Sequence, residues 1–127
     1  NKTKMGTLAS KKTDKKIYEN QNVVKVITNE NLDHSKFPEG VKFMRKIKEI
    51  NKNIYHHLGI YCYQFDTLSN FVSLNQSQNE IKEKLEQLRA LDNNIKINVS
   101  LAKQSPIGVD TEEDFVEIKK MMNYKTR

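Results

Sequence analysis

The segment from His57 to Tyr63 constrains the fold most, because its residue types alternate as they do in a strand with two different faces. One predicted face is apolar: Leu58, Ile60 and Cys62. The other carries hydrogen-bonding rings: His57, Tyr61 and Tyr63. Gly59 falls between His57 and Tyr61, where the missing side chain leaves room for a ligand or a second backbone. The segment therefore predicts a strand whose apolar face is directed to the core and whose polar face is available for a site.

Three other segments also predict strands. Met5–Ala9 is a short apolar piece within a polar terminus. Val23–Ile27 is a β-branched run of the kind found in buried strands. Ile95–Leu101 alternates apolar with polar residues, which predicts a one-sided strand.

Two helices are predicted from their capping residues. Ser77 and Glu80 form a capping box, and Glu80 is expected to pair with Lys84 four residues later. The apolar face of this helix comprises Ile81, Leu85, Leu88 and Leu91, and the helix is expected to end at Asn93-Asn94. Thr111 and Asp114 cap the last helix, whose apolar face comprises Phe115, Ile118, Met121 and Met122.

Two further stretches have apolar residues at roughly helical spacing. The first predicts a short amphipathic helix whose apolar stripe lies in the core: Phe65, Leu68, Phe71 and Val72. The second, from Val41 to Ile50, is compatible with another helix.

The order of these elements predicts an α/β fold in which helices flank a mixed or largely parallel sheet. No internal repeat and no linker composition interrupts the chain, so residues 1–127 are expected to form a single unit. Hydrophobic residues make up 36% and charged residues 30% of the chain, a polar balance that is nevertheless not typical of a disordered protein.

Basic residues are concentrated in the first part of the chain. The net charge is +6, and residues 1–52 contain 13 Lys and Arg against 6 Asp and Glu. A basic segment can attract nucleic acid. Few aromatic residues accompany it to stack on bases, so we favour a solvated lysine-rich surface and keep a small basic nucleic-acid-binding protein as a distant alternative.

The cysteine content and the lack of long apolar runs indicate the cellular location that we expect for the protein. The single cysteine, Cys62, cannot form an internal disulfide, and within a predicted strand it is expected to be a small buried residue. No apolar run approaches the roughly 18 residues of a membrane-spanning helix, and no signal-peptide pattern is present. We therefore expect a soluble, cytoplasmic protein with no membrane partner.

Few residues suggest chemistry by themselves. The sequence has no glycine-rich phosphate loop and no Cys-x-x-Cys or His-Glu-x-x-His metal motif. Asp110 follows the Gly108 turn and precedes a helix, so its carboxylate is either a hard oxygen ligand for Mg²⁺ or a simple cap. His57 and Tyr61 would lie about 13 Å apart in a regular strand, at about 3.3 Å per residue. They could contact opposite ends of a ligand or form a hydrogen-bonded core pair.

Three motifs have the order and spacing of a known family. They are His57-Leu58-Gly59-Ile60-Tyr61, Leu85-Glu86-Gln87-Leu88-Arg89, and Gly108-Val109-Asp110-Thr111 with Glu113-Asp114. Together they resemble the C-terminal half of the bacterial 3-deoxy-manno-octulosonate cytidylyltransferases, which are also called CMP-Kdo synthetases. The resemblance implies a Rossmann-like fold of the nucleotide-diphospho-sugar transferase type.

The resemblance also implies an activity and the residues that carry it. Members of the family transfer CMP from CTP to Kdo, an eight-carbon acid sugar of lipopolysaccharide, and release pyrophosphate. On this resemblance Asp110 binds Mg²⁺, and the residues that bind Kdo are His57, Gly59, Tyr61, Glu86 and Gln87. Helical periodicity alone instead predicts that Glu86 is solvated.

Two features depart from the family pattern. Where the family has a Tyr-Phe-Ser-Arg strand and a proline-containing dimer arm, this chain has Leu32–Pro38, with Lys36 in the place of the arginine. The family's N-terminal CTP loop and second metal aspartate have no counterpart in these 127 residues. We therefore expect a truncated form that corresponds to the sugar-binding half. Its expected partners are CTP, Kdo, and either a second copy in a homodimer or a separate N-terminal half. The alternative is a non-catalytic remnant that binds the sugar or a partner.

Overall fold

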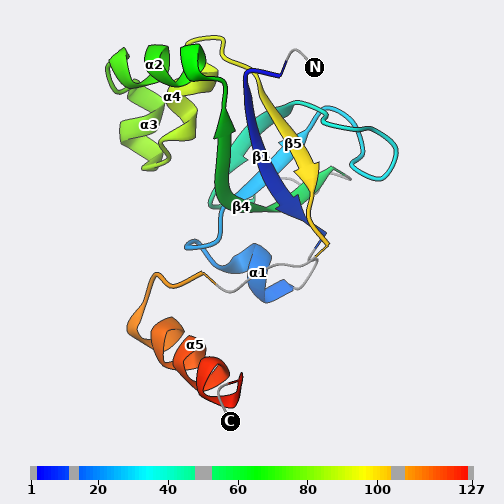
Figure 1. Ribbon diagram of the computed structural model, residues 1–127, viewed down its shortest axis with the longest axis vertical. Helices are drawn as coiled ribbons and strands as arrows, with labels where there is room; N and C mark the ends of the chain where they lie inside the picture. The colour runs from blue at the N-terminus through cyan, green and yellow to red at the C-terminus, as the bar shows by residue number, and fades with distance from the viewer. Residues whose placement is uncertain (1–2, 12–14, 48–52, 104–107, 126–127) are drawn as a thin grey trace.

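A five-stranded mixed sheet forms the centre of the molecule (Figure 1). The computed structural model describes residues 3–11, 15–47, 53–103 and 108–125. The strand order is β3-β2-β4-β1-β5. The strands are β1 (Met5–Ser10), β2 (Lys25–Thr28), β3 (Gly40–Met44), β4 (Ile54–Tyr63) and β5 (Ile97–Leu101). β1 and β5 are parallel, while β4 is antiparallel to both β1 and β2 and β3 is antiparallel to β2.

Within the described ranges, five helices accompany this sheet. They are α1 (Lys15–Glu19), α2 (Phe65–Ser73), α3 (Gln78–Glu83), α4 (Gln87–Asp92) and α5 (Glu112–Lys125). Figure 1 shows α2, α3 and α4 gathered beside the carboxyl end of β4, whereas α5 lies apart from the sheet at the opposite end of the molecule. In the described part of the chain, no helix is both long and apolar enough to cross a bilayer.

The core lies between the sheet and the short helices α3 and α4. Met5, Val26, Ile97 and Val99 from the strands are almost completely buried there, together with Leu85 and Ala90 from the helical side. Gly40 closes one edge of this core, because a Cβ at this position would lie 3.0 Å from Val99 Cγ2 and 3.2 Å from Phe43 Cζ. The hydrophobic effect of this burial is the main stabilising term available to the sheet.

The predicted fold class is confirmed as a mixed sheet with flanking helices, and the four predicted strands are present within a few residues of their expected ends. Both capping boxes are also present. Ser77 Oγ accepts from Glu80 N while Glu80 Oε2 accepts from Ser77 N. Thr111 Oγ1 accepts from Asp114 N while Asp114 Oδ2 accepts from Thr111 N. These local signals are reliable because each satisfies backbone donors that the first turn of a helix leaves open.

The helix predicted from Val41 to Ile50 is wrong. Residues 40–44 instead form β3, which pairs with β2 through Val26 and Phe43, and residues 48–50 lie outside the described part of the chain. The open edge of β2 provides hydrogen-bond partners for this segment, and that tertiary pairing outweighs a weak helical period.

The helix predicted to continue from Ser77 to Leu91 is broken in two. Lys84 ends α3 in the left-handed conformation, with φ of 56°, and α4 begins at Gln87. The predicted Glu80–Lys84 pair does not form, because Glu80 binds Arg89 across the break. Leu85 and Leu88 are buried as predicted, but Ile81 is 60% exposed.

The face assignment in β4 holds for Leu58, which is buried, but it is reversed beyond the bulge. The rings of Tyr61 and Tyr63 pack against the core, whereas Ile60 is 58% exposed and Cys62 is also exposed. The expectation that Cys62 is buried is therefore wrong. The α3–α4 pair covers the ring-bearing face, and aromatic rings supply a large apolar area despite their polar atoms.

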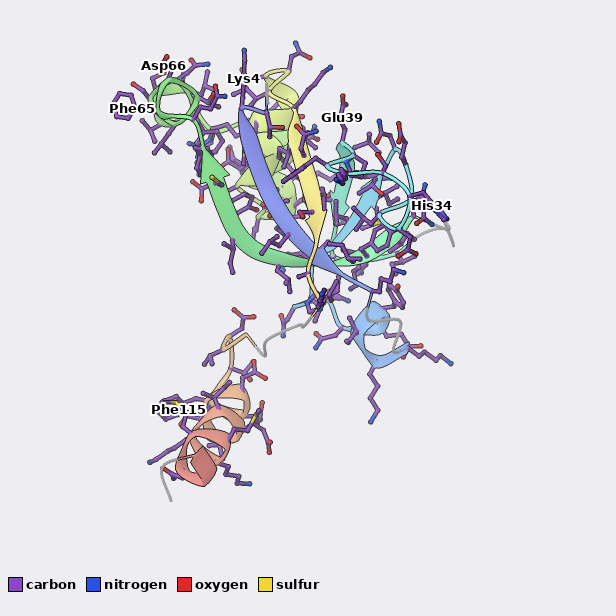
Figure 2. The ribbon with its side chains drawn as sticks, turned by 45° about the vertical axis from the view of Figure 1, so that its right-hand side comes forward. Lys4, His34, Glu39, Phe65, Asp66 and Phe115 are labelled. Carbon is purple, nitrogen blue, oxygen red and sulfur yellow. The ribbon has the colours of Figure 1, made fainter. Side chains whose placement is uncertain are left out.

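The core stripe predicted for α2 is also mostly wrong. Phe71 is buried, but Leu68 and Val72 are exposed and Phe65 is 83% exposed. Figure 2 shows Phe65 directed away from the rest of the molecule. A helical period identifies an amphipathic helix, but it does not say which element covers the apolar side.

Candidate functional site

A β-bulge in β4 creates the local geometry of the site. Thr7 pairs with Tyr61 and the next residue, Leu8, pairs with Leu58, so Gly59 and Ile60 are extra residues in β4. His57 and Tyr61 therefore pair with Ala9 and Thr7, two residues apart on β1, although they are four residues apart in β4. Their ring centroids lie 5.6 Å apart, and the predicted separation of about 13 Å for a regular strand is wrong.

Five rings follow one another across this face. In order they are Phe43, His57, Tyr61, Tyr63 and Phe71. The distance between ring centroids is 5.0 Å for Phe43 and His57, 6.1 Å for Tyr61 and Tyr63, and 6.0 Å for Tyr63 and Phe71. The Arg89 guanidinium lies 4.9 Å from the centroid of the Phe71 ring, a cation–π contact. This row of rings holds His57 and Tyr61 rigidly between the sheet and the helices.

His57 is a neutral hydrogen-bonding group in this setting. Burial, with a smaller contribution from the nearby His56, lowers the pKa of His57 to about 4. Its Nε2 lies 2.9 Å from the Thr7 hydroxyl. The imidazole is therefore uncharged at neutral pH, and it can exchange hydrogen bonds with a ligand but does not attract an anion.

Tyr61 is a hydrogen-bond donor. Burial raises the pKa of Tyr61, and the nearby Tyr63 and the Glu86 carboxylate raise it further. The phenol therefore keeps its proton at neutral pH. The influence of Glu86 also indicates that the start of α4 lies near this part of β4, although the two residues are far apart in the sequence.

The larger of the two pockets that hold predicted site residues has a volume of about 910 Å³ and lies beside the bulge. We call it the bulge pocket. It brings together three of the predicted site residues, His57, Gly59 and Asp110. Other residues that line it include Asn20, Asn22, Arg45, His56, Glu113 and Asp114. A Cβ built on Gly59 would meet no atom within 4 Å, so the room predicted at this position is present.

Asp110 fits the role of a single carboxylate ligand. Its side chain is exposed in the bulge pocket, and its backbone N donates to Asp114 Oδ2. Asp114 belongs to the cap of α5, where its hydrogen bonds with Asp110 N and Thr111 lower the pKa of its carboxyl. Within the described residues, no three His, Cys, Asp or Glu side chains form a group that could hold a metal by themselves. One carboxylate supplemented by substrate phosphates and water is an ordinary arrangement for Mg²⁺.

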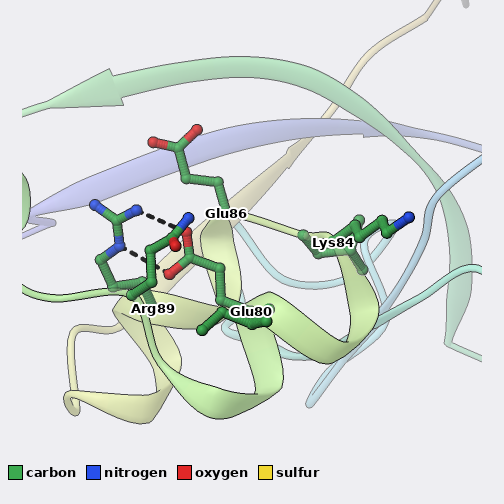
Figure 3. Close-up of a pocket in the computed structure, with 7 residues that line it drawn as sticks. Glu80, Lys84, Glu86 and Arg89 are labelled. Carbon is green, nitrogen blue, oxygen red and sulfur yellow. Dashed lines mark hydrogen bonds and ion pairs between the residues drawn. The ribbon is translucent and has the colours of Figure 1, made fainter.

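Glu86 lies in a separate, smaller pocket at the turn between α3 and α4 (Figure 3). Its carboxylate is directed away from the Glu80–Arg89 pair, in which Arg89 Nη2 donates to Glu80 Oε1 at 2.6 Å. Glu86 is exposed, as periodicity predicted, whereas the adjacent Gln87 is only 6% exposed. Of the predicted sugar-binding residues, His57 and Gly59 thus line the bulge pocket and Glu86 lines the smaller one, whereas Tyr61 and Gln87 line neither.

Arg45 is a candidate that sequence reasoning missed. It follows β3 directly and lines the bulge pocket with His57, whereas Lys36 is exposed in a loop before β3. Arg45 directly follows β3, the strand that comes after β2, so it is a second candidate besides Lys36 for the place of the family arginine. The sequence signal for this candidate was Phe43-Met44-Arg45. It was overlooked because the same residues also fit the helix predicted from Val41 to Ile50.

Backbone carbonyls hold Arg45 in place. Its Nη1 donates to Gln21 O at 3.2 Å and its Nη2 donates to Lys84 O at 3.1 Å. The buried Lys25 Nζ donates to Arg45 O at 2.6 Å, and burial together with the charge of Arg45 lowers the pKa of Lys25. These contacts tie β3 to the turn between α3 and α4, and they fix a cation at the rim of the bulge pocket.

Named relatives match nearly the whole chain but only part of their own length. The 3-deoxy-manno-octulosonate cytidylyltransferase of Bartonella henselae is 37% identical over 121 residues, which is 94% of this chain and 49% of that protein. The protein of the same name from Thermodesulfovibrio yellowstonii is 41% identical over 124 residues, with the same two shares. The chain thus spans about half the length of these curated relatives.

A solved structure matches the fold. A CMP:2-keto-3-deoxy-manno-octonic acid synthetase complexed with CTP superposes with a TM-score of 0.80 at 26% identity, covering 98% of this chain and 51% of that chain. A model of the cytidylyltransferase family matches residues 1–97, the part that contains strands β1 to β4, the bulge and both helices of the Glu86 turn. This chain therefore belongs to the cytidylyltransferase family.

Proposed function

We propose that this chain supplies the Kdo-binding half of a 3-deoxy-manno-octulosonate cytidylyltransferase. The observation that carries the proposal is the bulge pocket, which holds His57, Gly59 and Asp110 together in a fold that superposes on half of a CMP-Kdo synthetase. In the proposed reaction the anomeric hydroxyl of Kdo attacks the α-phosphate of CTP, and pyrophosphate leaves. CTP is an intracellular nucleotide, so the proposed activity belongs in the cytoplasm.

The described residues offer complementary groups for an acid sugar. Arg45 is the cation for the sugar carboxylate, because a guanidinium presents several donors in a fixed plane. His57 and Tyr61 provide neutral hydrogen bonds to hydroxyls, and Gly59 leaves the space that a sugar ring requires. Glu86 and Gln87 approach from the start of α4 and would bind the remaining hydroxyls.

Asp110 is the proposed ligand for Mg²⁺. When bound, the ion would neutralise negative charge on the substrate phosphates. Asp110 lies at the same pocket as His57, so a sugar held by His57 would lie close to the phosphates that the carboxylate helps to place. The cap formed by Asp114 and Thr111 fixes the backbone that carries Asp110.

Binding of CTP is proposed to require residues outside this sequence. No glycine-rich phosphate loop is present among the 127 residues. The chain spans about half of the relatives that carry the full name. We therefore expect it to bind Kdo without turning over CTP.

Isothermal titration with Kdo tests the proposed site. Arg45→Gln should weaken Kdo binding about 30-fold, the order of one charge-assisted hydrogen-bond pair, and Arg45→Lys should recover part of the loss. Lys36→Gln is the matched control, because it removes a cation in the exposed loop and should leave binding unchanged. The unfolding temperature of each variant verifies that it is folded. No heat of binding from the folded wild-type chain would contradict the proposal, as would a loss in the Lys36 variant alone.

A further inference from the structure

The Thr7 hydroxyl has three close neighbours at the β4 bulge. Thr7 Oγ1 lies 2.8 Å from Ile60 O, 3.2 Å from Leu58 O and 2.9 Å from His57 Nε2. Both carbonyl oxygens can only accept hydrogen bonds, and the hydroxyl has a single hydrogen to donate. That hydrogen must therefore be directed to the carbonyls, since otherwise two oxygens would face each other at 2.8 Å with no hydrogen between them.

This arrangement determines which nitrogen of His57 carries the proton. Because the hydroxyl hydrogen is used by the carbonyls, Thr7 Oγ1 is the acceptor and His57 Nε2 is the donor. A neutral imidazole has one proton, so Nδ1 has a free lone pair. The ring cannot turn to exchange the two nitrogens freely, because the Phe43 and Tyr61 rings pack against it at 5.0 and 5.6 Å.

The bulge pocket borders His57, which is 6% exposed and lines this pocket together with His56 and Gly59. Because Nε2 is engaged by Thr7, Nδ1 is the ring nitrogen left for a group that binds in the pocket. A group that hydrogen-bonds to Nδ1 must bring its own hydrogen, which excludes a bare carboxylate or phosphate oxygen and admits a donor such as a sugar hydroxyl.

We propose that Thr7 is a positioning residue that fixes His57 as its Nε2–H tautomer, so that Nδ1 accepts a hydrogen bond from a hydroxyl of the sugar. The inference rests on the proposed function for the identity of the ligand, but not for the tautomer. Thr7 has two tasks with one hydroxyl. It hydrogen-bonds to the carbonyls of Leu58 and Ile60 at the bulge, and it orients the imidazole. A purely structural residue would perform the first task only.

Nitrogen-15 NMR of the imidazole separates these two tasks. The His57 signals in the labelled chain are identified by their loss in His57→Gln. In the wild-type chain the proton should reside on Nε2 and Nδ1 should be bare. Thr7→Ser keeps the hydroxyl and should keep this pattern, whereas Thr7→Val keeps the shape and should give a mixture of tautomers. A wild-type spectrum with the proton on Nδ1 would overturn the inference, and this measurement does not depend on the folding of any variant.

Titration with Kdo then tests the ligand. Kdo should shift the Nδ1 resonance towards a hydrogen-bonded position and leave the Nε2 proton in place. Kdo affinity should fall about tenfold in Thr7→Val, the order of one net hydrogen bond, and stay within about twofold of wild type in Thr7→Ser. If Kdo shifts other resonances of the chain but not Nδ1, the positioning role is wrong. If Kdo shifts none, the proposed sugar site fails, while the ligand-free spectrum still decides the tautomer.

Discussion

At the scale of single residues, His57 shows how position changes chemistry. The sequence placed it on a polar strand face, and the structure buries it to 6% exposure beneath two other rings. An imidazole that remains neutral and has a defined tautomer is a selective partner for a hydroxyl. The same burial has a cost at acid pH that can be measured.

We predict that the protein loses stability between about pH 6.5 and pH 4. The native pKa of His57 is lowered to about 4, whereas an unfolded histidine titrates near 6.5. Between these values the unfolded state binds more protons, so the free energy of unfolding falls as the pH falls, by about 3 kcal/mol in total. Urea unfolding at several pH values measures this loss. His57→Gln, which cannot titrate, should flatten the profile over the same window, and an unchanged slope in this variant would contradict the assigned pKa.

Three candidate site residues lie together as the sequence implied, but their surroundings differ from the prediction. His57, Gly59 and Asp110 share one pocket as their motifs implied, although their binding roles remain predictions. Arg45 was missed because its strand was taken for a helix. The closeness of His57 and Tyr61 depends on the two extra residues of a bulge, which no residue pattern in a single strand reveals.

At the scale of elements, the bulge in β4 places a pocket beside the strand. Gly59 is one of its two extra residues, and its backbone borders the bulge pocket with open space where a side chain would be. Gly40 in β3 is surrounded by close atoms in the core. The two glycines therefore differ in their surroundings: Gly59 has open space beside it, and Gly40 is packed closely in the core.

Alanine substitutions should show the consequences of this difference. Gly59→Ala should leave stability within about 0.5 kcal/mol of wild type, because the added methyl meets no atom, but it should weaken Kdo binding. Gly40→Ala should destabilise the fold by about 2 kcal/mol, because its methyl would lie 3.0 Å from Val99 Cγ2. Chemical denaturation and Kdo titration of both variants provide the comparison. A Gly59 variant that unfolds more easily than the Gly40 variant would be inconsistent with this division.

One ion pair spans the break between α3 and α4. Arg89 Nε and Nη2 donate to the two oxygens of Glu80, and the side chains are 13% and 5% exposed. The hydrogen bonds from Arg89, together with that from Ser77, lower the pKa of Glu80 despite its burial. The pair replaces the continuous helix that the apolar period alone predicted, and it places Glu86 at the turn.

We predict that Glu80→Gln destabilises the protein by about 2 kcal/mol, because Arg89 loses its counter-charge in a mostly buried position. Glu83→Gln is the matched control: Glu83 is exposed on the same helix, and its loss should cost less than about 0.5 kcal/mol. Urea denaturation at pH 7 measures both. The lowered pKa of Glu80 means that its contribution in the wild-type protein is present above the usual glutamate pKa and is lost as the pH falls through the native value. Equal effects of the two substitutions would show that the pair does not stabilise the turn.

At the scale of the whole molecule, strands and caps were predictable and the packing between elements was not. Alternation and capping are local properties, so β1, β4, β5 and both capping boxes appear close to where the sequence placed them. Which face of β4 and α2 is covered depends on the position of other elements, and both assignments were partly wrong. Much apolar surface therefore remains exposed, including Phe65 on α2 and Phe115 and Met122 on α5.

The central functional proposal also concerns the whole molecule: this chain contributes the sugar-binding half of a cytidylyltransferase. The most direct test is pyrophosphate release from CTP and Kdo with Mg²⁺, measured first with the folded 127-residue chain and then after addition of the separately produced N-terminal half of the Thermodesulfovibrio yellowstonii relative. We predict no release by the chain alone, and Kdo-dependent release from the mixture that is abolished by Asp110→Asn in this chain. Kdo-dependent pyrophosphate release by the chain alone would contradict the account, because it would locate a complete nucleotide site within these residues.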